Sequence, residues 1–314
     1  MPERKAVDHV TSVREIRRRK TVIQSTAQII RGMKLIATVR LTKDRARAEA
    51  FRPYFEELRG MGAMVLEKRE WPEERKGPAG IVAFTSNRGL AGGYSQQIVR
   101  MIAGDGRFLP GTAVVYAVGK RGRDSLAAMG YEIRGDYSEA GERPDGVFAE
   151  KLAGRLLEDY EAGEIGEIYL AYTVFRSAVV QEPRLIRVLP AETEDGLEFE
   201  NSLGQESGPA AMREETAETG RAGTGEMEYE PDREQLRERM LPWYMGGMIY
   251  GACLEAAASE NGARMRAMDS AAGNGKKLLE ELELQYNRAR QDTITRELTE
   301  IAAGAGEIME HEEG

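Results

Sequence analysis

Residues 13–48 read VREIRRRKTVIQSTAQIIRGMKLIATVRLTKDRARA, a charged stretch in which apolar side chains recur with a seven-residue period. The apolar positions are Val13, Ile16, Ile23, Ala27, Ile30, Ala37, Leu41 and Ala48. No proline falls between Pro2 and Pro53, so the stretch predicts one helix of about 50 residues, ~70 Å long. A helix of that length cannot bury its stripe within a compact core and needs a long partner.

A second apolar stripe closes the chain. We expect its helix to begin near Pro231, to bend at Pro242 and the Gly246/Gly247 pair, and to end near Glu310. Its apolar positions are Leu254, Ala258, Met265, Met268, Ala272, Leu279, Leu282, Tyr286 and Ala289, followed in a shifted phase by Ile294, Leu298, Ile301, Ala305 and Ile308. The two stripes can most simply cover each other as a long antiparallel two-helix coiled coil, in which the longer helix protrudes alone at one tip.

The seam between these helices is weak for a coiled coil. Lys20 and Lys34 occupy apolar positions of the first helix, and Asn261 and Gly275 occupy such positions of the second. Polar seam residues weaken a pair of helices, and small ones give a thin rod. One interpretation is a shaft that fits into a larger body; the alternative is a free-standing coiled-coil scaffold, which predicts self-association.

The middle of the chain changes to a strand-and-helix pattern. Short runs rich in branched and aromatic residues, bounded by glycine, predict strands at 81–85, 113–118 and 167–174, with another possible at 184–189. Helix-like stretches lie between them, at 93–103, 121–129 and 147–162. This order predicts a Rossmann-like α/β domain with a small parallel sheet. The expected division is a shaft from 1–60 and 231–314, an α/β domain from 61–190, and an insertion at 191–230.

Thr85 to Tyr94 form a glycine-rich turn at the end of the first predicted strand. Such turns can bind phosphate. Here Tyr94 and Ser95 stand where a Walker loop needs lysine and a hydroxyl residue, and the glycine spacing is not that of a dinucleotide fingerprint. We therefore expect a structural turn built by Gly89, Gly92 and Gly93, and a nucleotide-binding α/β protein remains as an alternative.

Composition excludes several classes of function. The longest apolar runs fall far short of the roughly 20 residues that span a bilayer, and no secretory signal opens the chain. The single cysteine, Cys253, permits no internal disulfide. The two histidines, His9 and His311, lie at opposite ends, and no nucleophile motif is present. We expect no catalytic residue, cofactor or metal site in this chain.

Charge is distributed unevenly. Residues 1–60 hold 15 Lys and Arg against 7 Asp and Glu, whereas residues 191–230 hold 2 against 12. The acidic segment is typical of a solvated loop or partly disordered insertion. The basic first helix suits an acidic protein surface or anionic lipid better than nucleic acid, because it lacks the aromatic residues that stack on bases.

Three segments together resemble the gamma subunit, the central stalk, of F-type ATP synthases. The first helix carries VREIRRR at 13–19 and TAQIIRGMKLIA at 26–37. The turn TSNRGLAGGY at 85–94 is similar to the family's Ser-Asp-Arg-Gly-Leu-Cys-Gly-Gly turn, with Asn87 in place of Asp and Ala91 in place of Cys. The closing helix carries ASE at 258–260, ARMRAM at 263–268, YNRARQ at 286–291 and ITRELTEI at 294–301.

The resemblance implies a rotor that makes and breaks no bond itself. It would transmit rotation of a membrane c-ring to a hexamer of alpha and beta subunits, beside an epsilon-type stalk subunit, without inserting into the membrane. It also implies contact residues: Arg31, Met33 and Lys34 facing an acidic loop of beta, Arg290 and Gln291 touching a catch loop of beta, and Arg296, Glu297 and Thr299 inside the hexamer.

The resemblance also implies a location. Without a transit peptide, and without the regulatory cysteine pair of chloroplast members, the chain fits a peripheral protein at the cytoplasmic face of a bacterial cell membrane.

Overall fold

The computed structural model describes residues 13–66, 77–139, 145–177, 179–190 and 233–312. They belong to two compact units: the helical unit, Met1–Leu35 with Met268–Gly314, and the α/β unit, Ile36–Ala267. The acidic segment 191–230 lies outside the described residues.

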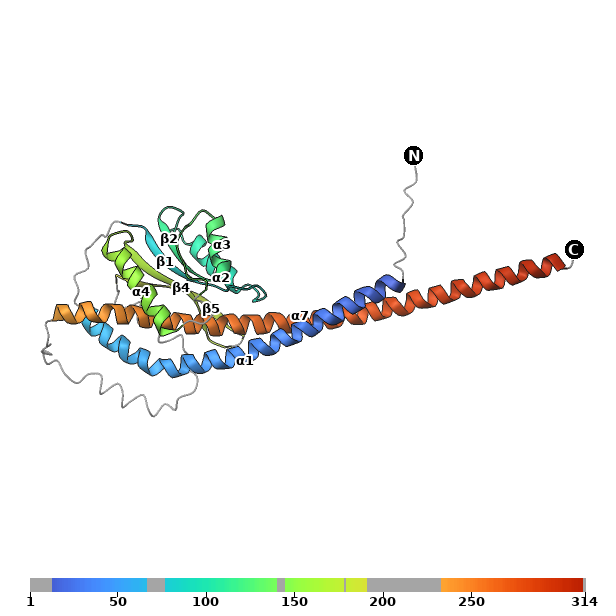
Figure 1. Cartoon of the computed structure of the whole chain (residues 1–314), viewed down its shortest axis with the longest axis horizontal. Helices are drawn as coiled ribbons and strands as arrows, with labels where there is room; N and C mark the ends of the chain where they lie inside the picture. Colours follow the sequence, from blue (N-terminus) through green and yellow to red (C-terminus); the bar gives the residue numbers. More distant parts are fainter. Residues whose placement is uncertain (1–12, 67–76, 140–144, 178, 191–232, 313–314) are drawn as a thin grey trace. The chain divides into compact units, whose positions relative to one another are not determined.

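Two long helices contribute to both units (Figure 1). Helix α1 spans Val13–Leu66, 54 residues, and helix α7 spans Arg233–Glu312, 80 residues. Each contains a proline, Pro53 in α1 and Pro242 in α7. A proline costs a helix one main-chain hydrogen bond. The rings of Phe51 and Tyr250 pack edge to face beside Pro53, with centroids 4.8 Å apart, and this contact helps to offset that cost. Helix α1 therefore continues past its predicted end.

The helices of the helical unit run antiparallel, as predicted. Lys20 of α1 forms an ion pair with Glu283 of α7. Further along α1, Lys34 forms an ion pair of 2.5 Å with Asp269, which lies earlier on α7. The two lysines in apolar seam positions therefore meet carboxylates of the opposite helix. Between these pairs, a side-chain carbon built on Gly275 would lie 3.8 Å from Cβ of Ala27, so small residues let the backbones approach closely.

The α/β unit contains a five-stranded sheet with strand order β3-β2-β1-β4-β5. The first four strands are parallel, and β5 pairs antiparallel with β4. The strands are β1 Ala79–Phe84, β2 Ala113–Val118, β3 Glu132–Asp136, β4 Glu167–Phe175 and β5 Gln181–Leu189. The shorter helices are α2 Tyr94–Gly104, α3 Lys120–Ala128 and α4 Gly146–Glu161. The predicted α/β fold is confirmed, but the sheet is mixed instead of wholly parallel.

Alternating side chains of the strands build two cores, one on each face of the sheet. Val82, Tyr116 and Leu170 lie with residues of α4 and α7 in one core. Ile81 and Val115, their neighbours in the strands, lie with residues of α2 and α3 in the other. The result is a three-layer arrangement in which α7 serves as a layer of the α/β unit.

No helix in the described ranges holds an apolar stretch long enough to cross a membrane.

Candidate functional site

The crevice at the carboxyl ends of β1 and β4 is where a sheet of this kind would bind a ligand. From β1 the chain continues to β2 on one side, and it later returns to β4 on the other side. That reversal of strand order separates the loops that follow β1 and β4, and ligands of doubly wound sheets bind in the opening so formed. If the α/β unit bound a nucleotide, this crevice is where the nucleotide would lie.

Helix α7 occupies this crevice. The carboxylate of Glu255 accepts a hydrogen bond of 2.7 Å from the main-chain N–H of Phe175, the last residue of β4. The hydroxyl of Ser259 donates to the main-chain oxygen of Thr173 at 3.0 Å. From the other side, the hydroxyl of Tyr94 donates to the main-chain oxygen of Ala256 at 3.1 Å. All three side chains are buried. The space that could hold a ligand is thus filled by the chain itself, which argues against the nucleotide-binding alternative.

The glycine-rich turn caps a neighbouring helix. Its residues accept hydrogen bonds from the first main-chain N–H groups of α3. The Asn87 side-chain oxygen accepts from the N–H of Lys120 at 2.9 Å, and the Ser86 main-chain oxygen accepts from that of Arg121 at 3.0 Å. The Thr85 hydroxyl accepts from the N–H of Gly122 at 3.0 Å. The amide of Asn87 also donates to the main-chain oxygen of Ser138 at 2.5 Å. An aspartate could not make that second bond, so asparagine at this position has its own structural role.

The three glycines of the turn differ in backbone conformation and in the space around an added Cβ. Gly92 has φ of +60°, where a side chain is strained. Gly93 has φ of −86°, and nothing lies within 4 Å of an added Cβ. At Gly89 an added Cβ would meet only the movable end of Arg121, at 2.9 Å.

We expect Gly92→Ala to lower the free energy of unfolding by roughly 1 to 2 kcal/mol, because alanine in the left-handed region is strained. Gly93→Ala, the control, should change it by less than about 0.5 kcal/mol. Urea denaturation of the purified chain measures both, and equal effects at the two positions would refute this account of the turn.

Two carboxylates lie along the seam between α1 and α7 in the α/β unit. Asp44 of α1 accepts a hydrogen bond of 2.8 Å from the side-chain amide of Asn261, and Glu260 pairs with Arg264 at 2.6 Å. Burial raises the pKa of Asp44, against the lowering effects of Asn261, Arg47 and Arg40. Burial likewise raises the pKa of Glu260, which Arg264 and Arg40 lower and Asp44 raises further. The ionised forms therefore cost stability.

Asp44→Asn should stabilise the chain at neutral pH. Because the folded pKa of Asp44 lies above its ordinary value of 3.8, its contribution to stability is present below that value and is lost as pH rises through the folded pKa. Thermal denaturation should show a higher melting temperature for the variant at about pH 7.5 and no difference at about pH 3.5. The exposed Asp124→Asn is the control. A variant less stable than the parent at neutral pH would contradict this interpretation.

The predicted contact residues all belong to the helical unit. Arg31 is exposed, Met33 is partly buried, and Lys34 pairs with Asp269. Arg290 and Gln291 are exposed on α7, and the Thr299 hydroxyl donates to the main-chain oxygen of Thr295 at 2.8 Å. Arg296 and Glu297 lie on α7, but their side chains are outside the described part of the chain.

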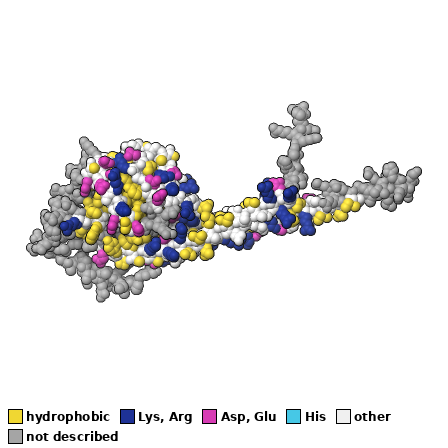
Figure 2. Space-filling view, viewed as in Figure 1, with side chains coloured by type: hydrophobic (Ala, Val, Ile, Leu, Met, Phe, Trp, Pro, Cys, Tyr) yellow, Lys and Arg dark blue, Asp and Glu magenta, His cyan; other side chains and the backbone are white. Residues whose placement is uncertain are grey.

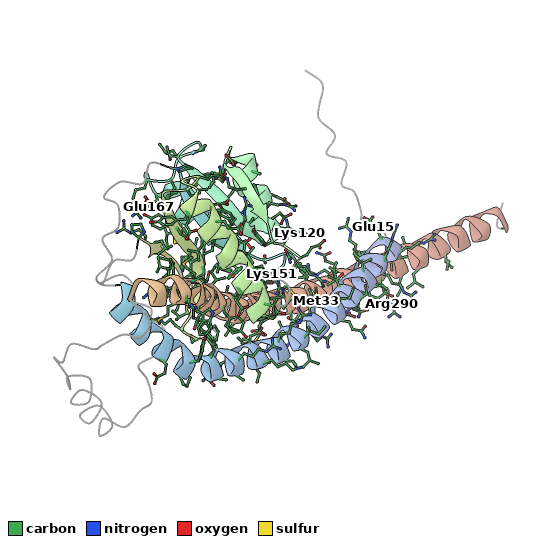
Figure 3. All side chains as sticks on the ribbon, turned by 60° about the vertical axis from the view of Figure 1, so that its left-hand side comes forward. Glu15, Met33, Lys120, Lys151, Glu167 and Arg290 are labelled. Atoms are coloured by element: carbon green, nitrogen blue, oxygen red, sulfur yellow. The ribbon has the colours of Figure 1, made fainter. Side chains whose placement is uncertain are left out.

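These residues form two groups at different levels of the helical unit. Met33 and Arg290, labelled in Figure 3, come from α1 and α7 respectively. Lys34 lies opposite Asp269, whereas Arg290 follows Asp269 by 21 positions on α7, a distance of ~30 Å along a helix. The two groups are thus separate surfaces and cannot form one compact site.

The helical unit also carries apolar side chains that the two helices leave uncovered. Val22, Ile29 and Leu35 are exposed on α1, and Leu284, Leu298 and Ile301 are exposed on α7. Val22 and Ile29 are seven residues apart, so this second face of α1 was readable from the sequence, although the seam residues alone were singled out there. Dark-blue basic side chains gather where the described part of α1 begins (Figure 2).

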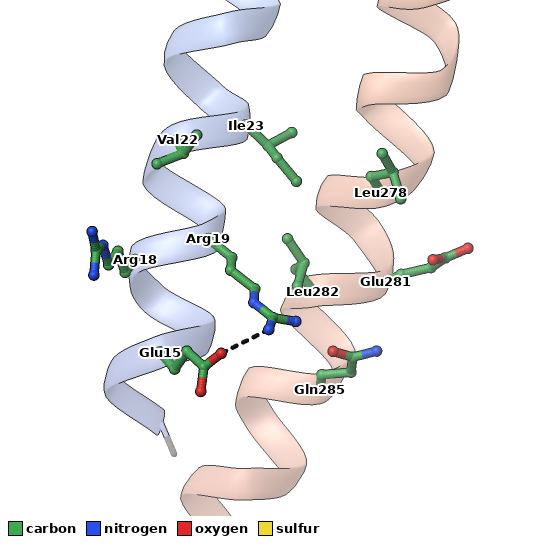
Figure 4. A pocket seen from close by; sticks show the side chains of 9 residues that line it. All are labelled: Glu15, Arg18, Arg19, Val22, Ile23, Leu278, Glu281, Leu282 and Gln285. Carbon is green, nitrogen blue, oxygen red and sulfur yellow. Dashed lines mark hydrogen bonds and ion pairs between the residues drawn. The ribbon is translucent and has the colours of Figure 1, made fainter. Parts of the chain in front are cut away.

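An open groove of about 520 Å³ lies between the helices near that point (Figure 4). Its apolar lining residues are Val22, Ile23, Leu278 and Leu282. Arg19 extends across the groove toward α7 and is held by Glu15 at 2.7 Å. Arg18 and Glu281 point away from each other at its rim (Figure 4). Within the described residues, no group of three or more metal-binding side chains is present.

Comparison with known proteins matches nearly the whole chain. The family model described as ATP synthase matches residues 12–307. An ATP synthase gamma chain of Lachnoclostridium phytofermentans is 42% identical over 306 residues, which cover 95% of this chain and 100% of that one. The sodium ion specific gamma chain of Acetobacterium woodii is 34% identical over 302 residues, covering 94% and 98%. In structure, the chain is similar to one of the Euglena gracilis mitochondrial ATP synthase (OSCP/F1/c-ring), with a TM-score of 0.63, 18% identity and 94% coverage of both chains.

Proposed function

Since the chain belongs to the family of F-type ATP synthase gamma subunits, which form the central stalk, we propose that its helical unit turns inside a ring of alpha and beta subunits and times their catalysis. The observation that carries this proposal is the pair of uncovered apolar faces on the helical unit. Exposed apolar stripes of this length mark a surface that a partner covers. Gamma-chain sequence similarity extends along the same two helices.

The mechanism is mechanical. Arg31 and the neighbouring exposed apolar residues lie on α1, and α7 presents a different set, so the helical unit has a different surface on each side. Each orientation of such a rod makes different contacts with the open and closed states of a surrounding catalytic subunit. Rotation then shifts the population of those states in turn, and nucleotide binding and release follow. The gamma chain supplies no reacting group.

The contact residues have proposed roles within this mechanism. Arg31, Met33 and Lys34 would face an acidic loop of beta, and Arg290 with Gln291 would touch a catch loop of beta. Arg296, Glu297 and Thr299 would lie inside the hexamer. Exposed ion pairs stabilise by only about 0 to 1 kcal/mol each, so a cationic surface can exchange partners as it moves.

Arg31→Glu combined with Lys34→Glu should leave the hexamer assembled but change its ATPase rate by about three- to tenfold, because two attractive contacts become repulsive. Lys34→Glu also breaks the exposed ion pair with Asp269, which costs only about 0 to 1 kcal/mol and should not prevent assembly. The exposed Lys151→Glu on α4 (Figure 3) is the matched charge reversal outside the proposed surface. The difference in ATPase rate between the double variant and the parent should be smaller at high salt than at low salt, because salt screens these charges. An unchanged rate at low salt would remove these two residues from the contact surface.

The proposed assembly contains further partners. The α/β unit would stand on the membrane c-ring beside an epsilon-type subunit, at the cytoplasmic face of a bacterial membrane. In this proposal residues 1–60 and 231–314 form the shaft and 61–190 the α/β domain.

Co-expression with the cognate alpha and beta subunits tests the proposal. We expect a complex of three alpha, three beta and one gamma chain that hydrolyses ATP. A gamma chain that never co-purifies with alpha and beta, although it is folded, would rule the proposal out. Self-association of the chain in place of this complex would favour the scaffold alternative.

A further inference from the structure

Three buried polar side chains tie α7 to the α/β unit at one level. We name this group the α7 clamp: Tyr94, Glu255 and Ser259, with the main-chain groups that they bond. Glu255 and Ser259 reach from α7 to the end of β4, and Tyr94 reaches from α2 to the main chain of α7. The clamp therefore joins α7 to two other elements of the unit, β4 and α2.

The clamp is sealed from water. Glu255 is 2% exposed, Ser259 0% and Tyr94 3%. A buried carboxylate is costly to desolvate, and an apolar side chain of similar size would often be at least as stable. Glu255 also faces Tyr172, another buried residue, and its charge contributes to raising the pKa of that phenol after burial itself. Because stability alone does not require a buried carboxylate at this place, we look to the geometry of its hydrogen bond for its role.

Apolar packing near the clamp does not by itself fix the orientation of α7. At the level of the clamp, the α7 residues that enter the core are small, Ala252, Cys253 and Ala256, whereas the large ones, such as Met248 and Ile249, lie earlier on α7. Such contacts are non-directional, and small side chains give few ridges that resist turning or sliding of a helix. Hydrogen bonds to fixed main-chain groups of β4 have one geometry and so define one register.

A second set of bonds supports the same joint from the hairpin between β4 and β5. Arg266 of α7 donates to the main-chain oxygen of Val179 and, at 2.7 Å, to the side-chain oxygen of Gln181. Arg266 follows Ser259 by seven positions, two turns further along the same face of α7. The attachment thus extends along α7 and resists rotation about the helix axis as well as tilting.

We propose that the α7 clamp is the joint through which torque passes between the α/β unit and α7, with Glu255 and Ser259 as its positioning residues. The inference rests on the proposed function. Helix α7 is continuous from Arg233 to Glu312, so a rotation imposed at the clamp is carried along one hydrogen-bonded helix. Without the clamp, only the apolar packing of earlier α7 residues such as Met248 and Ile249 holds the helix, so α7 can turn through a larger angle before the α/β unit follows.

The test compares ATP hydrolysis with ion transport in the complete enzyme. The enzyme is assembled in membrane vesicles of a host that lacks its own gamma chain. ATPase is measured together with ATP-driven ion uptake, using a proton-sensitive dye, or radioactive sodium where the ring carries sodium. The readout is the ratio of ion uptake to hydrolysis per assembled complex, which a loss of stability alone does not change.

Glu255→Ala combined with Ser259→Ala is the clamp variant. Its hydrolysis should stay within about twofold of the parent enzyme, while the ratio falls at least threefold. Glu255→Gln keeps an acceptor for the N–H of Phe175 and should restore most of the ratio. Ser86→Ala combined with Ser95→Ala is the matched control, because it removes a buried hydroxyl pair, 2.7 Å apart, whose hydrogen bonds join the glycine-rich turn to α2; it should leave the ratio unchanged.

If the clamp variant assembles and has the same ratio of ion uptake to hydrolysis as the parent, the proposal is overturned. If the clamp variant does not assemble, a second variant, Tyr94→Phe combined with Ser259→Ala, removes two hydroxyls and keeps the packing. A fall of at least twofold in its ratio of ion uptake to hydrolysis supports the proposal, and an unchanged ratio overturns it. A parent enzyme that neither assembles nor transports ions would instead overturn the proposed function, and the clamp with it.

Discussion

Gly119→Ala should lower the free energy of unfolding by about 3 kcal/mol or more, enough to prevent folding of a marginal chain. Gly119 lies between β2 and α3 with φ of +134°, and an added Cβ would lie 2.0 Å from the main-chain oxygen of Thr85. Backbone strain of about 1 to 3 kcal/mol adds to a clash with main-chain atoms that cannot move aside. Thr85 also caps α3, so the disturbance reaches the glycine-rich turn.

Urea denaturation of the purified chain measures this effect. Gly104→Ala is the control, because nothing lies within 4 Å of its added Cβ and it ends α2. That substitution should be neutral or slightly stabilising. A Gly119→Ala chain as stable as the parent would show that the junction between β2 and α3 has room for a side chain.

Replacing Ile294, Leu298 and Ile301 together by aspartate should leave the isolated chain as stable as the parent but reduce recovery of the alpha–beta–gamma complex at least tenfold. The three side chains recur at four and three residues on one face of α7 and are 43%, 62% and 68% exposed. Each apolar side chain that a partner buries stabilises the complex by roughly 1.5 to 3 kcal/mol, and a buried unpaired carboxylate costs more. The triple change thus acts through the partner alone.

Circular dichroism of the free chain and gel filtration of the co-expressed complex make this comparison. Leu109→Asp is the control, since Leu109 is equally exposed but belongs to the α/β unit. Recovery of the triple variant in the complex at parental yield would mean that this face of α7 stays in water.

Periodicity predicted the long helices because their apolar stripes repeat over many turns. It could not predict that α1 continues through Pro53, since packing around Phe51 and Tyr250 decides that. Strand β2 was found because both of its faces are buried and all its residues are apolar. Strand β3 was missed because Glu132–Asp136 is an edge strand that holds one large apolar residue, Ile133, among charged residues and a glycine, and none of its residues is fully buried.

The site was less accessible to sequence reasoning. The sequence distinguishes the glycine-rich turn from the known phosphate-binding motifs, but nothing local shows that Thr85 and Asn87 cap α3, because those bonds join residues more than 30 positions apart. Glu255 and Ser259 lie among the small residues of a helical stripe. Their hydrogen bonds depend on where β4 ends, which only the folded sheet determines.

Single-molecule observation of the assembled hexamer tests the central claim most directly. With Cys253 replaced by serine, a cysteine placed at the exposed Leu109 can carry a bead while the alpha and beta subunits are fixed to a surface. Addition of ATP should turn the bead in one direction with three equal resting positions per revolution, as the threefold hexamer requires. A hexamer that hydrolyses ATP while the bead on its gamma chain stays still would contradict the account.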